Sequence, residues 1–130
     1  MEIAGVETAA TIFVIDDDEA VRDSIRTLLG AVGFTTVGFS DANDYLCDGA
    51  PRSCDCIVLD VEMPELSGID LLDRMRGNGM ETPVILMTGT PSEVARQAAE
   101  RTGAMLLEKP FKGAQLLACV ELAVTPVTKQ

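Results

Sequence analysis

Histidine is absent from the 130-residue sequence. A chain without it has no histidine base for a serine or cysteine hydrolase, no mixed cysteine and histidine zinc site, and no phosphohistidine of its own. Basic residues are also scarce, since 10 Lys and Arg stand against 21 Asp and Glu, for a net charge of −11. This surplus of negative charge argues against direct, tight binding of nucleic acid by this chain alone.

Long apolar runs are missing as well, although hydrophobic residues make up 47% of the sequence. No run approaches the length of a membrane span, and the start, residues 1–7, is acidic where a secretion signal is basic. We therefore expect a soluble, cytoplasmic protein that makes no membrane contact. Four cysteines lack zinc or redox spacing and are expected to be ordinary thiols: Cys47, Cys54, Cys56 and Cys119.

Short apolar runs alternate with helical patterns five times along the chain. This alternation predicts an α/β fold, in which helices cover both faces of a doubly wound, five-stranded parallel sheet. We expect one domain over residues 11–124, an N-terminal lead-in over 1–10 and a tail over 125–130. The predicted strands are 11–15, 34–39, 56–59, 83–87 and 104–107, and the helices that follow them are about 19–32, 41–46, 68–76, 92–101 and 114–123.

Polar residues follow four of these strands at the point where each ends. They are Asp16, Asp17 and Asp18 after the first strand, and then Asp60, Thr88 and Lys109. The carboxyl ends of parallel strands meet at one edge of a sheet, where ligands bind in open α/β folds. Clustered carboxylates repel unless a cation joins them, and oxygen ligands alone select Mg²⁺ or a similar hard ion. A cation, an ammonium and a hydroxyl aimed at one spot suit a phosphoryl group, for which Asp60 is the nucleophile at hand.

Each of these residues also has a simpler interpretation. The acidic run 16–19 alone would be a solvated helix start, Thr88 alone a donor to a helix turn, and Lys109 alone a surface lysine. These interpretations weaken because the residues occupy equivalent places after successive strands. The combination therefore favours a site over scattered surface charge.

The same residues carry a family resemblance. The segments 15–22 (IDDDEAVR) and 60–68 (DVEMPELSG), the pair Thr88–Gly89, and the segment 109–111 (KPF) resemble the receiver domains of bacterial two-component response regulators, with most similarity to the FixJ type. The resemblance covers residues 11–124. It implies five helices and a flavodoxin-like sheet of order 2-1-3-4-5.

The resemblance also implies a role for each site residue. Asp60 would be the phosphoacceptor, and Thr88 and Lys109 the switch hydroxyl and the phosphate-binding ammonium. Mg²⁺ would be held by Asp16, Asp17, Asp60 and the backbone carbonyl of Glu62. We expect Glu62 and Thr90, which occupy loop positions beside the phosphate, to tune its hydrolysis.

The implied function is a phosphorylation switch. A sensor histidine kinase or a phosphotransfer protein would donate the phosphoryl group, and the signal would pass to a downstream protein or to an effector domain outside this sequence. Dimerisation on phosphorylation is an open possibility, and no turnover of a separate substrate is expected. One departure concerns the output: receivers usually carry Tyr or Phe three residues before the lysine, where this chain has Leu106.

Three other functions compete with this interpretation. The first is a pseudo-receiver that is never phosphorylated and acts only as an interaction module; the intact Asp60, Thr88 and Lys109 argue against it. The second is a flavin carrier of similar architecture, but its phosphate loop would be rich in Ser, Thr and Gly where this chain has acids at 16–19. The third is a magnesium-dependent phosphatase, for which no second acid or base is visible.

Overall fold

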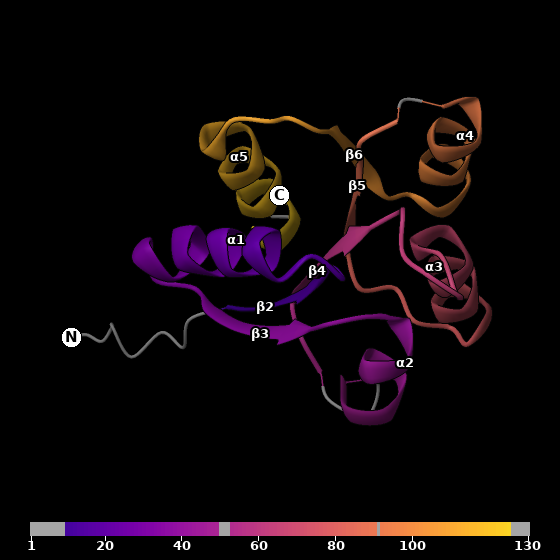
Figure 1. Cartoon of the computed structure of the whole chain (residues 1–130), viewed down its shortest axis with the longest axis horizontal. Coiled ribbons are helices and arrows are strands. Elements are labelled where there is room, and N and C mark those ends of the chain that lie inside the picture. The colour runs from indigo at the N-terminus through magenta and orange to yellow at the C-terminus, as the bar shows by residue number, and fades with distance from the viewer. Residues whose placement is uncertain (1–9, 50–52, 91, 126–130) are drawn as a thin grey trace, which may run out of the picture.

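Five parallel strands form the centre of the computed structural model, which describes residues 10–49, 53–90 and 92–125 (Figure 1). The sheet order is β3-β2-β4-β5-β6, which confirms the expected order 2-1-3-4-5 when strands are counted along the chain. Apart from Ala10 and Thr125, the predicted lead-in and tail lie outside the described residues. The strands are β2 (Thr11–Ile15), β3 (Thr35–Phe39), β4 (Cys56–Asp60), β5 (Val84–Thr88) and β6 (Met105–Glu108).

Helices cover both faces of the sheet, with α1 and α5 on one side and α2, α3 and α4 on the other (Figure 1). Side chains alternate along each strand, so Ile12 and Val14 of β2 enter the core under α1 and α5, whereas Phe13 and Ile15 enter the opposite core. Within the described residues, no helix is long and apolar enough to cross a membrane. The helices are α1 (Glu19–Ala31), α2 (Ala42–Asp44), the π-helix η1 (Tyr45–Gly49), α3 (Gly68–Gly77), α4 (Glu93–Thr102) and α5 (Gly113–Val124).

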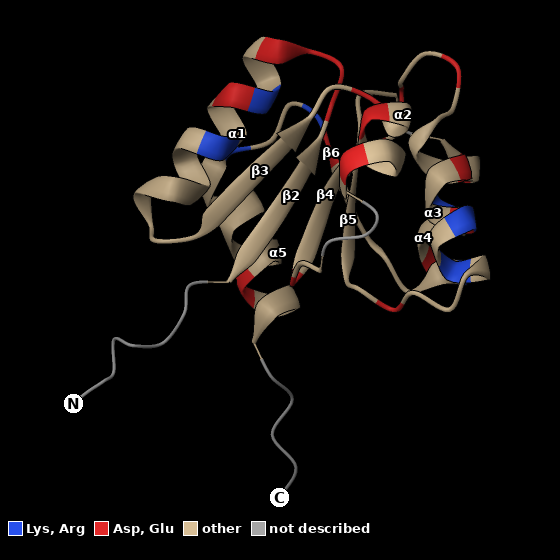
Figure 2. Ribbon diagram, turned by 90° about the horizontal axis from the view of Figure 1, so that it is seen from below, with Lys and Arg blue, Asp and Glu red and all other residues tan. Residues whose placement is uncertain are grey.

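Two interior strands of the sheet, β4 and β5, are buried along their whole length. Strands covered on both faces need continuous apolar runs, which explains the sequences Cys56–Leu59 and Val84–Met87. The last residue of each strand is the exception, because Asp60 and Thr88 are polar yet only 3% and 0% exposed. Both residues lie at the carboxyl edge of the sheet. Figure 2 shows acidic segments in red beyond the arrowheads at this edge.

Several predicted boundaries differ from the structure by one residue, including that of the strand predicted at 83–87, which is β5 (Val84–Thr88), and two differences have a visible cause. The last strand is shifted by one residue and ends on Glu108, because the N–H of Ala104, two residues beyond α4, still donates to the carbonyl of Ala99 in that helix at 3.0 Å. The helix predicted over 41–46 has only three α-helical residues and then widens into η1, which ends at Gly49. The sequence Gly-Ala-Pro at 49–51 predicts a break after this helix, and residues 50 and 51 lie outside the described residues.

The wide turn of η1 has a packing reason. A Cβ at Gly49 would lie 2.6 Å from ring atoms of both Phe39 and Tyr45, so the backbone at this glycine rests directly on two aromatic rings. These rings pack edge to face with centroids 5.6 Å apart, and Phe13 lies beneath both. The aromatic cluster therefore supports the backbone of η1 up to Gly49.

Candidate functional site

Three carboxylates meet at the carboxyl edge of the sheet. Asp16 and Asp17 follow β2 and Asp60 ends β4, and one oxygen of each lies within 4.8 Å of the others. Asp16 and Asp60 are buried, whereas Asp17 is exposed to solvent. The structure thus brings together the three side chains that were predicted to hold a metal ion.

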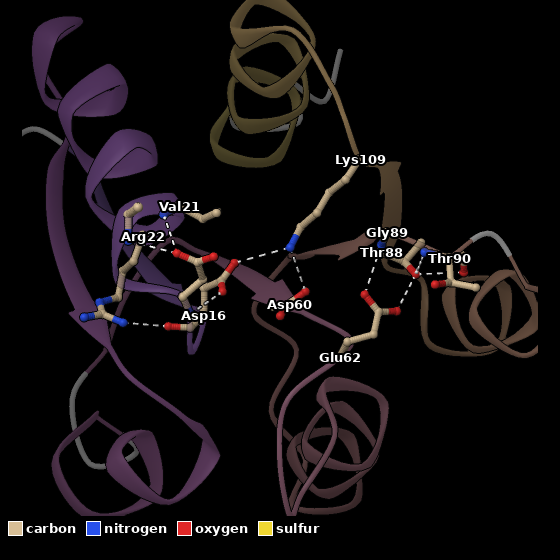
Figure 3. A network of polar contacts seen from close by, with 11 residues as sticks. Asp16, Val21, Arg22, Asp60, Glu62, Thr88, Gly89, Thr90 and Lys109 are labelled. Carbon is tan, nitrogen blue, oxygen red and sulfur yellow. Dashed lines mark hydrogen bonds and ion pairs between the residues drawn. The ribbon is translucent and has the colours of Figure 1, made fainter.

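Lys109, which directly follows the edge strand β6, contacts two of these carboxylates. Its Nζ lies 3.1 Å from Oδ1 of Asp60, a hydrogen-bonded ion pair, and 3.6 Å from Oδ2 of Asp16, an ion pair only (Figure 3). One ammonium therefore faces two buried carboxylates, with Asp17 beside them. The local charge is negative overall.

Burial and this excess of negative charge shift the pKa values of Asp60, Asp16 and Lys109. The pKa of Asp60 is raised to about 6, first by burial and then by the charge of Asp16, against the opposing effect of Lys109. Burial likewise raises the pKa of Asp16, in opposition to the N–H of Asp18 and the charge of Lys109. For Lys109, burial lowers the pKa, but its contacts with Asp60 and Asp16 outweigh this effect and raise it.

The donor set fits a hard divalent cation. Within the described part of the chain, Oδ2 of Asp16 is buried and accepts no hydrogen bond, although a buried carboxylate oxygen normally has a partner. The three side chains Asp16, Asp17 and Asp60 offer only oxygen ligands, which Mg²⁺ prefers. The predicted fourth ligand, the backbone carbonyl of Glu62, stays a prediction.

The loop after β2 is held by contacts of its own. The N–H of Asp18 donates to Oδ1 of Asp16 at 2.9 Å, and the carboxylate of Asp18 accepts from the N–H groups of Ala20 and Val21, which caps α1. Of the acidic run, Asp18 therefore has the helix-start role, whereas Asp16 and Asp17 face the site. Arg22, which the sequence did not single out, donates from Nη1 to the carbonyl of Asp16 at 2.7 Å (Figure 3).

The loop after β4 turns back tightly over Asp60. A Cβ at Gly68 would lie 2.1 Å from the carbonyl oxygen of Asp60, a distance that no side chain tolerates. The N–H of Gly68 donates to the carbonyl of Val61 at 3.0 Å, which closes the turn. A glycine is therefore needed at the start of α3 for the loop to lie against the acceptor residue.

Thr88 lies at the same edge of the sheet, but its hydroxyl forms hydrogen bonds with residues outside the carboxylate cluster. Its hydroxyl lies 2.6 Å from Oε2 of Glu62 and 3.0 Å from the carbonyl of Thr90 (Figure 3). The N–H of Thr90 donates to Oγ1 of Thr88, and the N–H of Gly89 donates to Oε1 of Glu62. The side chain of Glu62 is thus a polar partner of Thr88. Sequence reasoning placed Glu62 beside the site but missed this bond, because the spacing of the two residues does not reveal it.

Leu106 lies one strand away from Thr88. It pairs with Leu86 in the sheet, and since alternate residues of a strand share a face, it projects from the same face as Thr88. Its side chain is half-buried against the core under α3 and α4. The position usually taken by an aromatic ring is therefore filled by an aliphatic side chain that belongs to the packed interior.

A flavodoxin-like sheet of this order, with an aspartate cluster, a lysine and a threonine at its carboxyl edge, has the architecture of a receiver domain. Residues 12–121 match the response regulator receiver domain, and the chain belongs to this family.

Relatives support the same assignment. The transcriptional regulatory protein FixJ of Bradyrhizobium diazoefficiens is 43% identical over 119 residues, which are 90% of this chain and 58% of FixJ. The response regulator protein TodT of Pseudomonas putida is 31% identical over 95% of this chain and 55% of TodT. A crystal structure of FixJ-N superposes with a TM-score of 0.81 at 27% identity and covers 93% of this chain and 98% of that one.

These matches confirm the resemblance to the FixJ type. They also show that the chain spans little more than half the length of the curated relatives it matches, 58% for FixJ and 55% for TodT.

Proposed function

We propose that this receiver domain accepts a phosphoryl group on Asp60 in a reaction that depends on Mg²⁺, and that a histidine kinase or a phosphotransfer protein donates the group. The observation that carries the proposal is the placement of Asp60. Its carboxylate is buried at the strand end, 3.1 Å from the ammonium of Lys109 and within the cluster that includes Asp16 and Asp17. A nucleophile, a counter-charge and metal ligands at one point are the parts that phosphoryl transfer requires.

In the proposed reaction, a carboxylate oxygen of Asp60 attacks the phosphorus of a phosphoimidazole. The new O–P bond forms as the N–P bond breaks, and the imidazole leaves with the electron pair and takes a proton from solvent. Lys109 stabilises the charge on the phosphoryl oxygens. When bound by Asp16, Asp17 and Asp60, together with the carbonyl of Glu62, Mg²⁺ would supply further neutralisation of that charge. The domain turns over no substrate other than its own phosphoryl group.

The proposed output is a change of shape around Thr88. An aspartyl-phosphate brings negative charge and acceptor oxygens to the site, and the hydroxyl of Thr88 is the donor on the neighbouring strand. Its movement would shift a pre-existing equilibrium between two conformations. Leu106 replaces the usual ring, so we infer that the signal leaves through the loop after β5 and through α4.

We further propose that the signal passes to a downstream protein or to an effector domain of a longer regulator, since the relatives extend beyond the length of this chain. Phosphorylation-dependent dimerisation is compatible with this output. The net charge of −11 supports a role without direct nucleic acid contact by these 130 residues. The proposed location is the cytoplasm.

The proposal is tested with Mg²⁺ and acetyl phosphate, a small phosphoryl donor. We expect intact mass spectrometry to show the gain of one acid-labile phosphoryl group, and we expect neither Asp60→Asn nor the wild type in EDTA to show it. A gain of the same size in Asp60→Asn would contradict the acceptor assignment. The absence of any gain in the wild type would favour the interaction-only pseudo-receiver.

A further inference from the structure

We propose that the side chain of Glu62 is a positioning residue that holds Thr88 in a resting place and opposes its response to a phosphoryl group. This inference rests on the proposed function, because it concerns the same acceptor site. Thr88 donates from Oγ1 to Oε2 of Glu62 at 2.6 Å, and the N–H of Gly89 donates to Oε1 at 3.0 Å (Figure 3). The two carboxylate oxygens thus hold the threonine side chain and the backbone that follows it.

The hydroxyl of Thr88 has a single proton to donate. A threonine hydroxyl can donate only once, and two acceptors lie within its reach, the carboxylate of Glu62 and the carbonyl of Thr90 at 3.0 Å. The carboxylate is charged and nearer, and 2.6 Å falls within the range of about 2.5–2.7 Å that is typical of a hydroxyl bonded to a carboxylate. Thr88 therefore gives its proton to Glu62 in the resting domain.

A phosphoryl oxygen on Asp60 needs the same proton. Thr88 is 0% exposed, so its hydroxyl exchanges one protein partner for another rather than for bulk water. On β6, Thr88 pairs with Glu108, whose side chain is exposed, and the acceptors that the described residues offer the hydroxyl are Glu62 and the carbonyl of Thr90. Contact between Thr88 and the phosphoryl group therefore requires that Glu62 release both Thr88 and Gly89.

This release sets part of the equilibrium between the resting and switched forms. Replacing Glu62 by Gln keeps the size of the side chain but converts a charged acceptor into a neutral one, and its NH₂ group cannot accept from Gly89. The loss of charge assistance favours the switched form. Removing a negative charge near Asp60 would by itself also favour an anion there, so the test needs a variant that changes charge alone.

Glu65 provides that control. It lies in the same loop, is exposed, and accepts a hydrogen bond from Nδ2 of Asn43 at 3.0 Å, which a glutamine oxygen can also accept. Glu65→Gln and Glu62→Gln therefore remove the same charge from the same loop. Only the second variant alters a partner of Thr88.

The probe is the beryllium trifluoride anion with Mg²⁺, which stands in for a phosphoryl group on a carboxylate. We expect Glu62→Gln to bind it about fivefold more tightly than the wild type by calorimetry, and Glu65→Gln to change the affinity less than twofold. We also expect the amide resonance of Gly89 in unliganded Glu62→Gln to move toward its position in the bound wild type. A role of Glu62 in folding alone would produce neither result.

A double-mutant cycle locates the effect. In a Thr88→Val background, the gain from Glu62→Gln should shrink to the part that the loss of charge beside Asp60 contributes, because no hydroxyl remains to be released. Equal gains from the two glutamine variants, or a gain that Thr88→Val leaves undiminished, would overturn the role of Glu62 and leave the acceptor assignment standing. Binding by the wild type as weak as that of Asp60→Asn would overturn the proposed function, and the role of Glu62 with it.

Discussion

Nζ of Lys109 lies between two buried aspartates, in a hydrogen bond with Asp60 and beyond hydrogen-bond reach of Oδ2 of Asp16. The ammonium therefore compensates the charge of Asp60 through a hydrogen bond, but it compensates the charge of Asp16 only through a longer electrostatic contact. The domain without a bound cation therefore holds an uncompensated charge in its acceptor site, which destabilises the fold. A cation, or the removal of a carboxylate, relieves this destabilisation.

The first prediction concerns Asp60→Asn in metal-free buffer at neutral pH. The pKa of Asp60 is raised from 3.8 to about 6 by burial and by Asp16, so folding with the carboxylate ionised is unfavourable. A difference of one pKa unit between the folded and unfolded states corresponds to about 1.4 kcal/mol. Because Lys109 loses its partner in the variant, which offsets part of the gain, we expect the variant to be more stable by about 2 kcal/mol. Chemical denaturation in EDTA measures this difference. A less stable variant would show that the ion pair with Lys109 outweighs the burial of the charge.

The same substitution has a defined pH dependence. A carboxyl group whose pKa is higher in the folded state than in the unfolded state contributes stability at low pH that is lost as the pH rises through the folded value. We therefore expect the advantage of Asp60→Asn to be largest above pH 6 and to shrink between pH 6 and 4. Comparing the two proteins at each pH cancels the titration of the other acids. A difference independent of pH would have a cause other than ionisation.

The second prediction concerns Mg²⁺. A ligand that binds only the folded state adds about 1.4 kcal/mol of stability at ten times its dissociation constant. We expect the midpoint of thermal unfolding to rise with Mg²⁺ in the wild type and to stay constant in Asp16→Asn, because the buried, unbonded Oδ2 of Asp16 is lost as a ligand. Asp18→Asn, which alters the cap of α1 rather than the cluster, is the matched control and should still respond.

The third prediction concerns Gly68. A Cβ at this position meets the carbonyl oxygen of Asp60 at 2.1 Å, and the atom it meets belongs to the backbone of a central strand. We expect Gly68→Ala to lower the unfolding free energy by about 2 kcal/mol or more, the range for overpacking a buried site. In Gly30→Ala of α1, the added Cβ meets nothing within 4 Å, and this control should be stabilised by about 0.5–1 kcal/mol.

The fourth prediction concerns Arg76 at the end of α3. Its guanidinium donates to the carbonyls of Thr102, Met80 and Thr82 at 2.9–3.0 Å, which ties α3 to the end of α4 and to the chain that leads into β5. We expect Arg76→Gln to cost about 2 kcal/mol, because one amide cannot replace three charge-assisted bonds. Arg74→Gln, at an exposed position of the same turn, should change the stability by less than about 0.5 kcal/mol.

Local sequence rules predicted the features that depend on neighbours along the chain. The helices expected at about 68–76 and 92–101 correspond to α3 (Gly68–Gly77) and α4 (Glu93–Thr102). Asp60 and Thr88 fall at strand ends because an apolar run stops there. The convergence of these residues on one edge followed from the parallel alternation alone.

Contacts across elements were beyond such rules. The bond between Glu62 and Thr88 joins residues 26 positions apart, and its formation depends on the direction of two side chains in adjoining loops. The π-helix at 45–49 is set by rings contributed from β2 and β3. The one-residue shift of β6 reflects the continuation of the α4 turn through Ala104, which apolar composition alone does not reveal.

The aromatic cluster beneath η1 also determines how this domain can be observed. The chain has no tryptophan and a single tyrosine, Tyr45, which is 1% exposed and packs against Phe13 and Phe39. Its hydroxyl donates to the sulfur of Met80 at 3.7 Å, at the far end of α3 from the acceptor loop. Intrinsic fluorescence of the domain therefore reports the integrity of one corner of the core, and it should remain nearly constant while ligands bind at Asp60.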